Sequence, residues 1–116
     1  MKHWQKHLAE FLGTALLLCA VIGSGIMADN LSQGHAGIAL LANTLATVFA
    51  LYVLIEALGP VSGAHFNPAV SLIMWHQQKL SRSLLVGYVF MQLLGAWAGA
   101  CLANAMFDLD VIQVST

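Results

Sequence analysis

An asparagine–proline pair, Asn67-Pro68, lies in a short polar stretch of an otherwise apolar chain, and its residue types point to a specific chemistry. Proline at the first position of a helix loses only an N–H group that would have no partner, and asparagine just before it is a preferred N-cap. The pair predicts a helix that begins at Pro68. If the side-chain oxygen of Asn67 caps the amide of Ala69 or Val70, its NH₂ group stays free to donate to a water or hydroxyl oxygen.

Other chemistries have little support in the sequence. His65 and Ser62 are close in the chain, but we interpret them as part of the loop before Asn67, not as a base–nucleophile pair. His35, His65 and His76 fall at different depths of the expected topology, which argues against a metal site. The sequence contains no phosphate-binding loop and no basic tract. We expect no enzymatic activity, no cofactor, no metal and no nucleic-acid partner.

Three long apolar runs make up most of the chain. Hydrophobic residues account for 59% of the 116 residues and charged residues for 8%, and the mean hydropathy is +0.81. The runs Phe11–Ala28, Ile38–Ile55 and Leu84–Phe107 contain no Asp, Glu, Lys or Arg. Each is long enough as a helix to cross a hydrocarbon layer of about 30 Å. The first run could instead be a secretory signal, but its length and Glu10 at its start favour a retained helix in the lipid bilayer.

The segment between the second and third runs is too short to cross. Pro68 to Gln77 would measure about 15 Å as a helix, half the hydrocarbon thickness. Leu58–His65 contains two glycines and a proline, which predicts extended chain leading to this half-helix. We predict one all-α membrane domain over residues 1–116, with three transmembrane helices and one re-entrant half-helix. The expected bounds are about 8–28, 36–57 and 83–107 for the spanning helices, and about 58–77 for the re-entrant loop with its half-helix.

The polar loop indicates a pathway across the membrane. Irregular main chain at bilayer depth survives only where it is buried in protein or lines a water-filled cavity. A helix that begins there presents about +0.5 of an elementary charge, which in a narrow pore repels cations and hydronium but not neutral solutes. The leading hypothesis is a passive channel for water or small uncharged solutes, with Asn67 as a donor in its path.

The distribution of charge predicts one orientation. The four cationic residues, Lys2, Lys6, Lys79 and Arg82, fall on two segments that three spans place on the same side. The positive-inside rule makes that side cytoplasmic, with the amino terminus inside and the carboxyl terminus outside, in a cell (inner) membrane. The aspartates fall on the opposite side, at positions 29, 108 and 110.

Two segments, Ala9-Glu-Phe-Leu-Gly-Thr14 and Ser62-Gly-Ala-His-Phe-Asn-Pro-Ala-Val-Ser71, closely resemble the amino-terminal half of the aquaporin, or major intrinsic protein, family. The resemblance implies that the pore is lined by Asn67-Pro68-Ala69 and by carbonyl groups that accept hydrogen bonds from single-file water. Those carbonyls belong to Gly63, Ala64, His65 and Phe66. It further implies that Glu10 is a buried carboxylate that braces the loop. The residue pattern alone left Glu10 equally open to a place at the membrane interface.

The chain departs from the family by carrying one repeat unit where a full member has two inverted ones. A second Asn-Pro-Ala motif is absent from the 116 residues. We expect a second half-channel as partner, either another polypeptide or a copy of this chain, although antiparallel copies conflict with the charge bias. The alternative is a truncated, non-conducting fragment that only associates with full-length relatives.

Two further features bear on selectivity and assembly. By the family's spacing, Thr47 occupies a helix position where many members carry an aromatic ring, which suggests a wider filter for glycerol-like solutes or neutral metalloid hydroxides such as arsenite. A helix hydroxyl bonded to the carbonyl four residues earlier is the structural alternative. Small residues repeat at Ala42, Ala46 and Ala50, and at Gly95 and Gly99. They predict close helix contacts within the chain or in a tetramer-like assembly.

Overall fold

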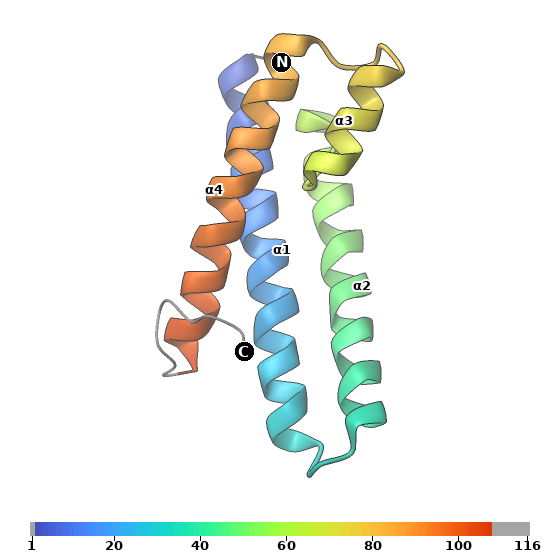
Figure 1. The fold of residues 1–116 in the computed structure, drawn as a ribbon, viewed down its shortest axis with the longest axis vertical. Helices are drawn as coiled ribbons and strands as arrows, with labels where there is room; N and C mark the ends of the chain where they lie inside the picture. Colours follow the sequence, from blue (N-terminus) through green and yellow to red (C-terminus); the bar gives the residue numbers. More distant parts are fainter. Residues whose placement is uncertain (1, 108–116) are drawn as a thin grey trace.

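The computed structural model describes residues 2–107, and it is all-α over that range (Figure 1). The elements are α1 (His3–Leu31), α2 (Ala36–Ser62), α3 (Pro68–His76) and α4 (Arg82–Met106). By length and composition α1, α2 and α4 can each cross a membrane, whereas α3 has nine residues and measures about 14 Å. The predicted fold class is confirmed.

Helix α1 lies between α2 and α4, and α3 packs against α4. Among the described residues α2 contacts no long helix other than α1. Only 6% of an 18-residue apolar stretch of α2 is buried, against 28% of the corresponding stretch of α4. The buried positions are mostly small or polar, whereas large apolar side chains such as Leu40, Phe49 and Trp97 point outward. This inverted burial pattern suits a helix bundle whose outer solvent is lipid.

After α2 the chain turns back on itself. In Figure 1, α3 begins partway along the molecule and runs to the same end at which α2 finishes and α4 begins. The segment between α2 and α4 therefore starts and finishes at the same end of the molecule, as the short length of α3 predicts. Extended chain from Leu58 is wrong for its first five residues, because α2 continues through Pro60 to Ser62. The helix ends at Gly63, whose φ of 90° is left-handed and whose N–H donates to the Gly59 carbonyl at 2.8 Å.

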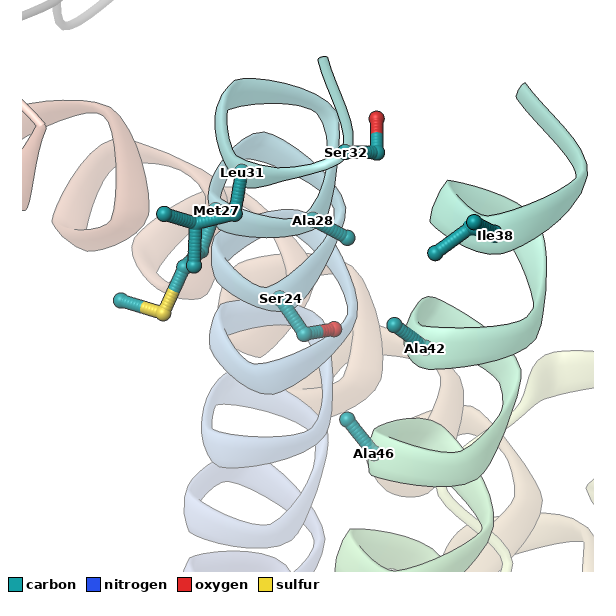
Figure 2. A pocket seen from close by; sticks show the side chains of 8 residues that line it. All are labelled: Ser24, Met27, Ala28, Leu31, Ser32, Ile38, Ala42 and Ala46. Carbon is teal, nitrogen blue, oxygen red and sulfur yellow. The ribbon is translucent and has the colours of Figure 1, made fainter. Parts of the chain in front are cut away.

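Glycines allow α1 and α4 to approach closely. A Cβ at Gly95 would lie 2.6 Å from the Phe11 carbonyl oxygen, and a Cβ at Gly99 would collide with the carbonyl of Ala15. On the other side of α1, Ala42 and Ala46 of α2 face Ser24 across an apolar groove (Figure 2). The glycine stripe of α4 therefore serves a contact within the chain, whereas Ala42 is exposed and Ala46 is half-buried along the groove.

The charges at the ends of the helices follow the predicted topology. Lys6 and Lys79 line one cavity, which places the amino-terminal end of α1 and the α3–α4 connection together. Asp29 lies near the opposite end of α1. Asp108 and Asp110 lie outside the described residues, so their predicted side is not addressed by the structure.

Candidate functional site

The candidate site is the turn of irregular chain between α2 and α3, residues 63–67, which we call the reversing loop. Its backbone is left-handed at three positions, with φ of 90° at Gly63, 54° at Ala64 and 53° at Phe66. Glycine adopts this conformation freely, but each of the other two residues adopts it at a cost of about 1–2 kcal/mol. The loop therefore needs support from outside itself.

Glu10 of α1 supplies that support. Its carboxylate is fully buried and accepts four hydrogen bonds from three different parts of the chain. One oxygen accepts from the Ser62 hydroxyl at 2.6 Å and the His65 amide at 3.2 Å. The other accepts from the Phe66 amide at 2.9 Å and from Nε2 of Gln92 at 2.7 Å. These four hydrogen bonds join Glu10 to the end of α2, to the reversing loop and to α4.

The loop's donors and acceptors are separated. All four amides from Gly63 to Phe66 donate inward, to the Gly59 carbonyl, the Ser62 hydroxyl and Glu10. The four carbonyls of the same residues accept no hydrogen bond from any part of the described chain. A run of four unpaired acceptors is rare in a folded protein, where most backbone groups are paired. The reversing loop is therefore an acceptor strip that a donor from outside the chain can complete.

Asn67 adds a donor at the end of this strip. Its side-chain oxygen accepts from the Ala69 amide at 2.8 Å, which confirms the predicted N-cap. Its NH₂ group has no partner among residues 2–107, and the residue is exposed. Pro68 is half-buried at the first position of α3 and Ala69 is exposed. The amino-terminal end of α3, with its partial positive charge, therefore lies directly beside the loop.

A second set of polar groups holds the loop from the side of α3 and α4, and the sequence reasoning missed it. Nδ1 of His65 lies 2.9 Å from the Ser71 hydroxyl, which in turn accepts from Gln92 at 2.9 Å. Tyr88 donates to the Ser62 carbonyl at 2.7 Å. A signal was present, because Tyr88 and Gln92 are polar groups four residues apart in an apolar helix and share a face.

The reversing loop borders a cavity of about 510 Å³ at the end of the molecule that carries the amino terminus. Its lining is mixed, with polar groups from α1, the loop, the α3–α4 connection and α4, including Lys6, Ser62, Gly63, His65, Lys79 and Tyr88. The groove of Figure 2, about 290 Å³, is almost wholly apolar and lies near the α1–α2 connection. Ser24 and Ser32 are the polar residues that line this groove, so the first cavity offers a hydrated solute many more hydrogen-bonding groups.

The side chains of two predicted residues, Thr47 and Phe66, take no part in the loop's hydrogen bonds. Thr47 is half-buried on α2, and its hydroxyl donates to the Asn43 carbonyl at 2.8 Å, as the structural alternative predicts. Contact with a solute would therefore use the Thr47 oxygen as an acceptor. Phe66 turns its ring away from solvent, with 4% of its surface exposed, and packs on Gly13 where a Cβ would collide with it.

Three apolar helices and a re-entrant half-helix capped by asparagine define a multi-pass integral membrane protein with a polar reversing loop. The chain belongs to the major intrinsic protein family, whose model matches residues 1–114. It is 54% identical over 111 residues to the aquaglyceroporin AqpS of Rhizobium meliloti, an alignment that covers 96% of this chain and 47% of that protein.

Other relatives show the same partial coverage. The chain is 40% identical to the lens fiber major intrinsic protein of Gallus gallus, over 84% of this chain and 35% of the relative. It is 38% identical to a probable glycerol uptake facilitator protein of Thermotoga maritima, over 83% and 41%. The chain thus spans less than half the length of each of these three relatives. The resemblance of its two motifs to this family is confirmed.

Proposed function

We propose that this chain forms one half of a channel for passive transport of water and small uncharged solutes. The observation that carries the proposal is the separation of donors and acceptors in the reversing loop. Its amides are held by Glu10 and its neighbours, and its carbonyls are left without partners beside the free NH₂ group of Asn67. A hydroxyl group that passes can donate to the strip and accept from Asn67.

The same arrangement argues against permeation by cations. Unpaired carbonyls alone would attract a cation, but the amino-terminal end of α3 adds about +0.5 of an elementary charge at the point where the strip ends. In a narrow pore with little water this charge raises the energy of a positive ion and leaves that of a neutral molecule almost unchanged. Hydronium is excluded by the same field.

A second half-channel completes the pathway in this proposal. Among the described residues the exposed apolar face of α2 has no helix against it, and the reversing loop is open on the side away from Glu10. A different polypeptide segment or a copy of this chain fills that side, and whole channels assemble further in a tetramer-like oligomer. The cationic end, with Lys6 and Lys79, faces the cytoplasm of an inner membrane, and the end near Asp29 faces outward.

The solute we favour is a small polyol. The names of two relatives, an aquaglyceroporin and a probable glycerol uptake facilitator protein, fit such a solute. Thr47 fits as well, because a threonine occupies less of a pore than an aromatic ring. Neutral metalloid hydroxides such as arsenite share the chemistry of glycerol, since they are small, uncharged and carry several hydroxyl groups.

The test is to isolate the chain from membranes with whatever it binds, identify the assembly by native mass spectrometry, and reconstitute it in vesicles. We expect a second half-channel in the assembly and faster swelling in a glycerol gradient than in empty vesicles. An assembly that contains a second half yet swells no faster than empty vesicles refutes the proposal. Such a result favours the alternative, a non-conducting fragment that associates with full-length relatives.

A further inference from the structure

The ring of His65 links the buried polar groups to the cavity beside the loop. A continuous line of hydrogen bonds runs from Glu10 to Gln92 at 2.7 Å, from Gln92 to Ser71 at 2.9 Å, and from Ser71 to Nδ1 of His65 at 2.9 Å. Glu10 and Ser71 are fully buried and Gln92 is 2% exposed. No solvent reaches these groups, so each proton must be placed on a partner within the line.

The placement of protons follows from Glu10. A carboxylate only accepts, and both of its oxygens already accept from backbone amides, which can only donate. Gln92 must therefore turn its NH₂ group toward Glu10. The second N–H of the same group is the donor to the Ser71 oxygen.

The Ser71 hydroxyl then has one hydrogen left to place. Its oxygen already accepts from Gln92, and its one other partner among residues 2–107 is Nδ1 of His65. A fully buried hydroxyl without an acceptor costs free energy, so Ser71 donates and Nδ1 accepts. A nitrogen that accepts carries no proton, which leaves the proton of the neutral imidazole on Nε2.

Nε2 of His65 is turned to where a solute can reach it. Among residues 2–107 it has no hydrogen-bond partner, and His65 lines the 510 Å³ cavity. The edge of the ring with Nε2 lies beside Gly63, where an added Cβ would be 3.2 Å from this nitrogen. The absence of a side chain at Gly63 therefore keeps the donor open.

We infer that Glu10, Gln92 and Ser71 are positioning residues that fix His65 as the neutral Nε2–H tautomer. His65 thereby becomes a permanent hydrogen-bond donor in the cavity, aimed at the hydroxyl oxygen of an uncharged solute. The solute contact rests on the proposed channel, whereas the tautomer does not. Together with the carbonyls of the reversing loop, such a donor orients a polyol hydroxyl, because it binds the oxygen while the carbonyls bind the hydrogen.

The tautomer is tested by solid-state NMR of the ¹⁵N-histidine-labelled protein in lipid, with the His65 signals assigned by their loss in His65→Gln. We expect Nε2 protonated and Nδ1 unprotonated in the unchanged protein, and a partial or complete switch to Nδ1–H in Ser71→Ala. Ser83→Ala, at an exposed serine of α4, is the matched control and leaves the His65 signals unchanged. Nδ1–H in the unchanged protein overturns the inference.

A purely structural role for Ser71 would lower stability and leave the tautomer in place, and this outcome also overturns the inference. Flux through the reconstituted assembly provides the second readout. We expect Ser71→Ala to lower glycerol flux relative to water flux by about two- to tenfold, the value of one neutral hydrogen bond. An Nε2–H tautomer in an assembly without flux counts against the proposed channel alone. An unchanged flux ratio in Ser71→Ala overturns the solute contact.

Discussion

The substitution Glu10→Gln tests whether the carboxylate of Glu10 holds the reversing loop. It keeps the size of the side chain and removes two acceptor sites. The left-handed residues Ala64 and Phe66 together cost about 2–4 kcal/mol. Glu10 holds them through the amides of His65 and Phe66, and two hydrogen bonds to a charged acceptor contribute about 3–6 kcal/mol. In the unchanged protein the support exceeds the strain.

In Glu10→Gln the balance reverses. A neutral amide has one oxygen, so one of the two bonds is lost and the other falls to about 0.5–1.5 kcal/mol. The remaining support is smaller than the strain, and the loop leaves its native conformation. The change in balance is about 3 kcal/mol, roughly a hundredfold in the population of the native loop.

The assay is hydrogen exchange at the amides of residues 63–66, measured together with helix content and solute flux. We expect exchange in the loop to accelerate by roughly a hundredfold, flux to fall at least tenfold, and the helices to persist. Glu56→Gln, at an exposed carboxylate of α2, is the matched control. Loop exchange and flux equal to those of the control would show that Glu10 does not hold the loop.

Three other substitutions test the remaining elements. Asn67→Asp places a full negative charge at the amino-terminal end of α3, and we expect proton and cation leak to rise in a conducting assembly. The control is Asn30→Asp, at an exposed site. An unchanged leak in Asn67→Asp contradicts the role of Asn67. Thr47→Phe should lower glycerol flux more than water flux, whereas equal reductions would place Thr47 outside the constriction. Gly99→Leu forces a side chain into the Ala15 carbonyl and should destabilise the protein by about 1–3 kcal/mol in denaturant titration. The control is Gly37→Leu, where an added Cβ meets nothing within 4 Å, and equal losses in both variants contradict close α1–α4 packing.

The helices and the turn of the chain could be predicted because they depend on local quantities. The length of each apolar run and its lack of charged residues define the spans. The segment from Pro68 is long enough to cross only half of the hydrocarbon layer, so the chain must return to the side from which it came. The cap of Asn67 on Ala69 follows from the same two residues. The end of α2 could not be predicted this way, because Gly59-Pro60 looks like a break, yet the helix tolerates Pro60 and ends only where Gly63 becomes left-handed.

The partners of Glu10 were harder to predict, because they come from three parts of the chain that lie far from Glu10 in the sequence. Sequence position left Glu10 open between the membrane interface and the loop, and only the resemblance to aquaporins favoured the loop. Ser71 and Gln92 were missed for a related reason. The shared face of Tyr88 and Gln92 marks a polar side of α4, but the groups that this side contacts are defined only once the neighbouring helices and their register are known.

The central claim is that the carbonyls of residues 63–66 and the NH₂ group of Asn67 face the solute path. The most direct measurement is an experimental structure of the complete assembly in lipid, at a resolution that shows water. We predict ordered water within hydrogen-bond distance of those carbonyls and of the Asn67 side chain. Carbonyls bonded to protein groups of the second half, with no water beside them, would contradict the claim.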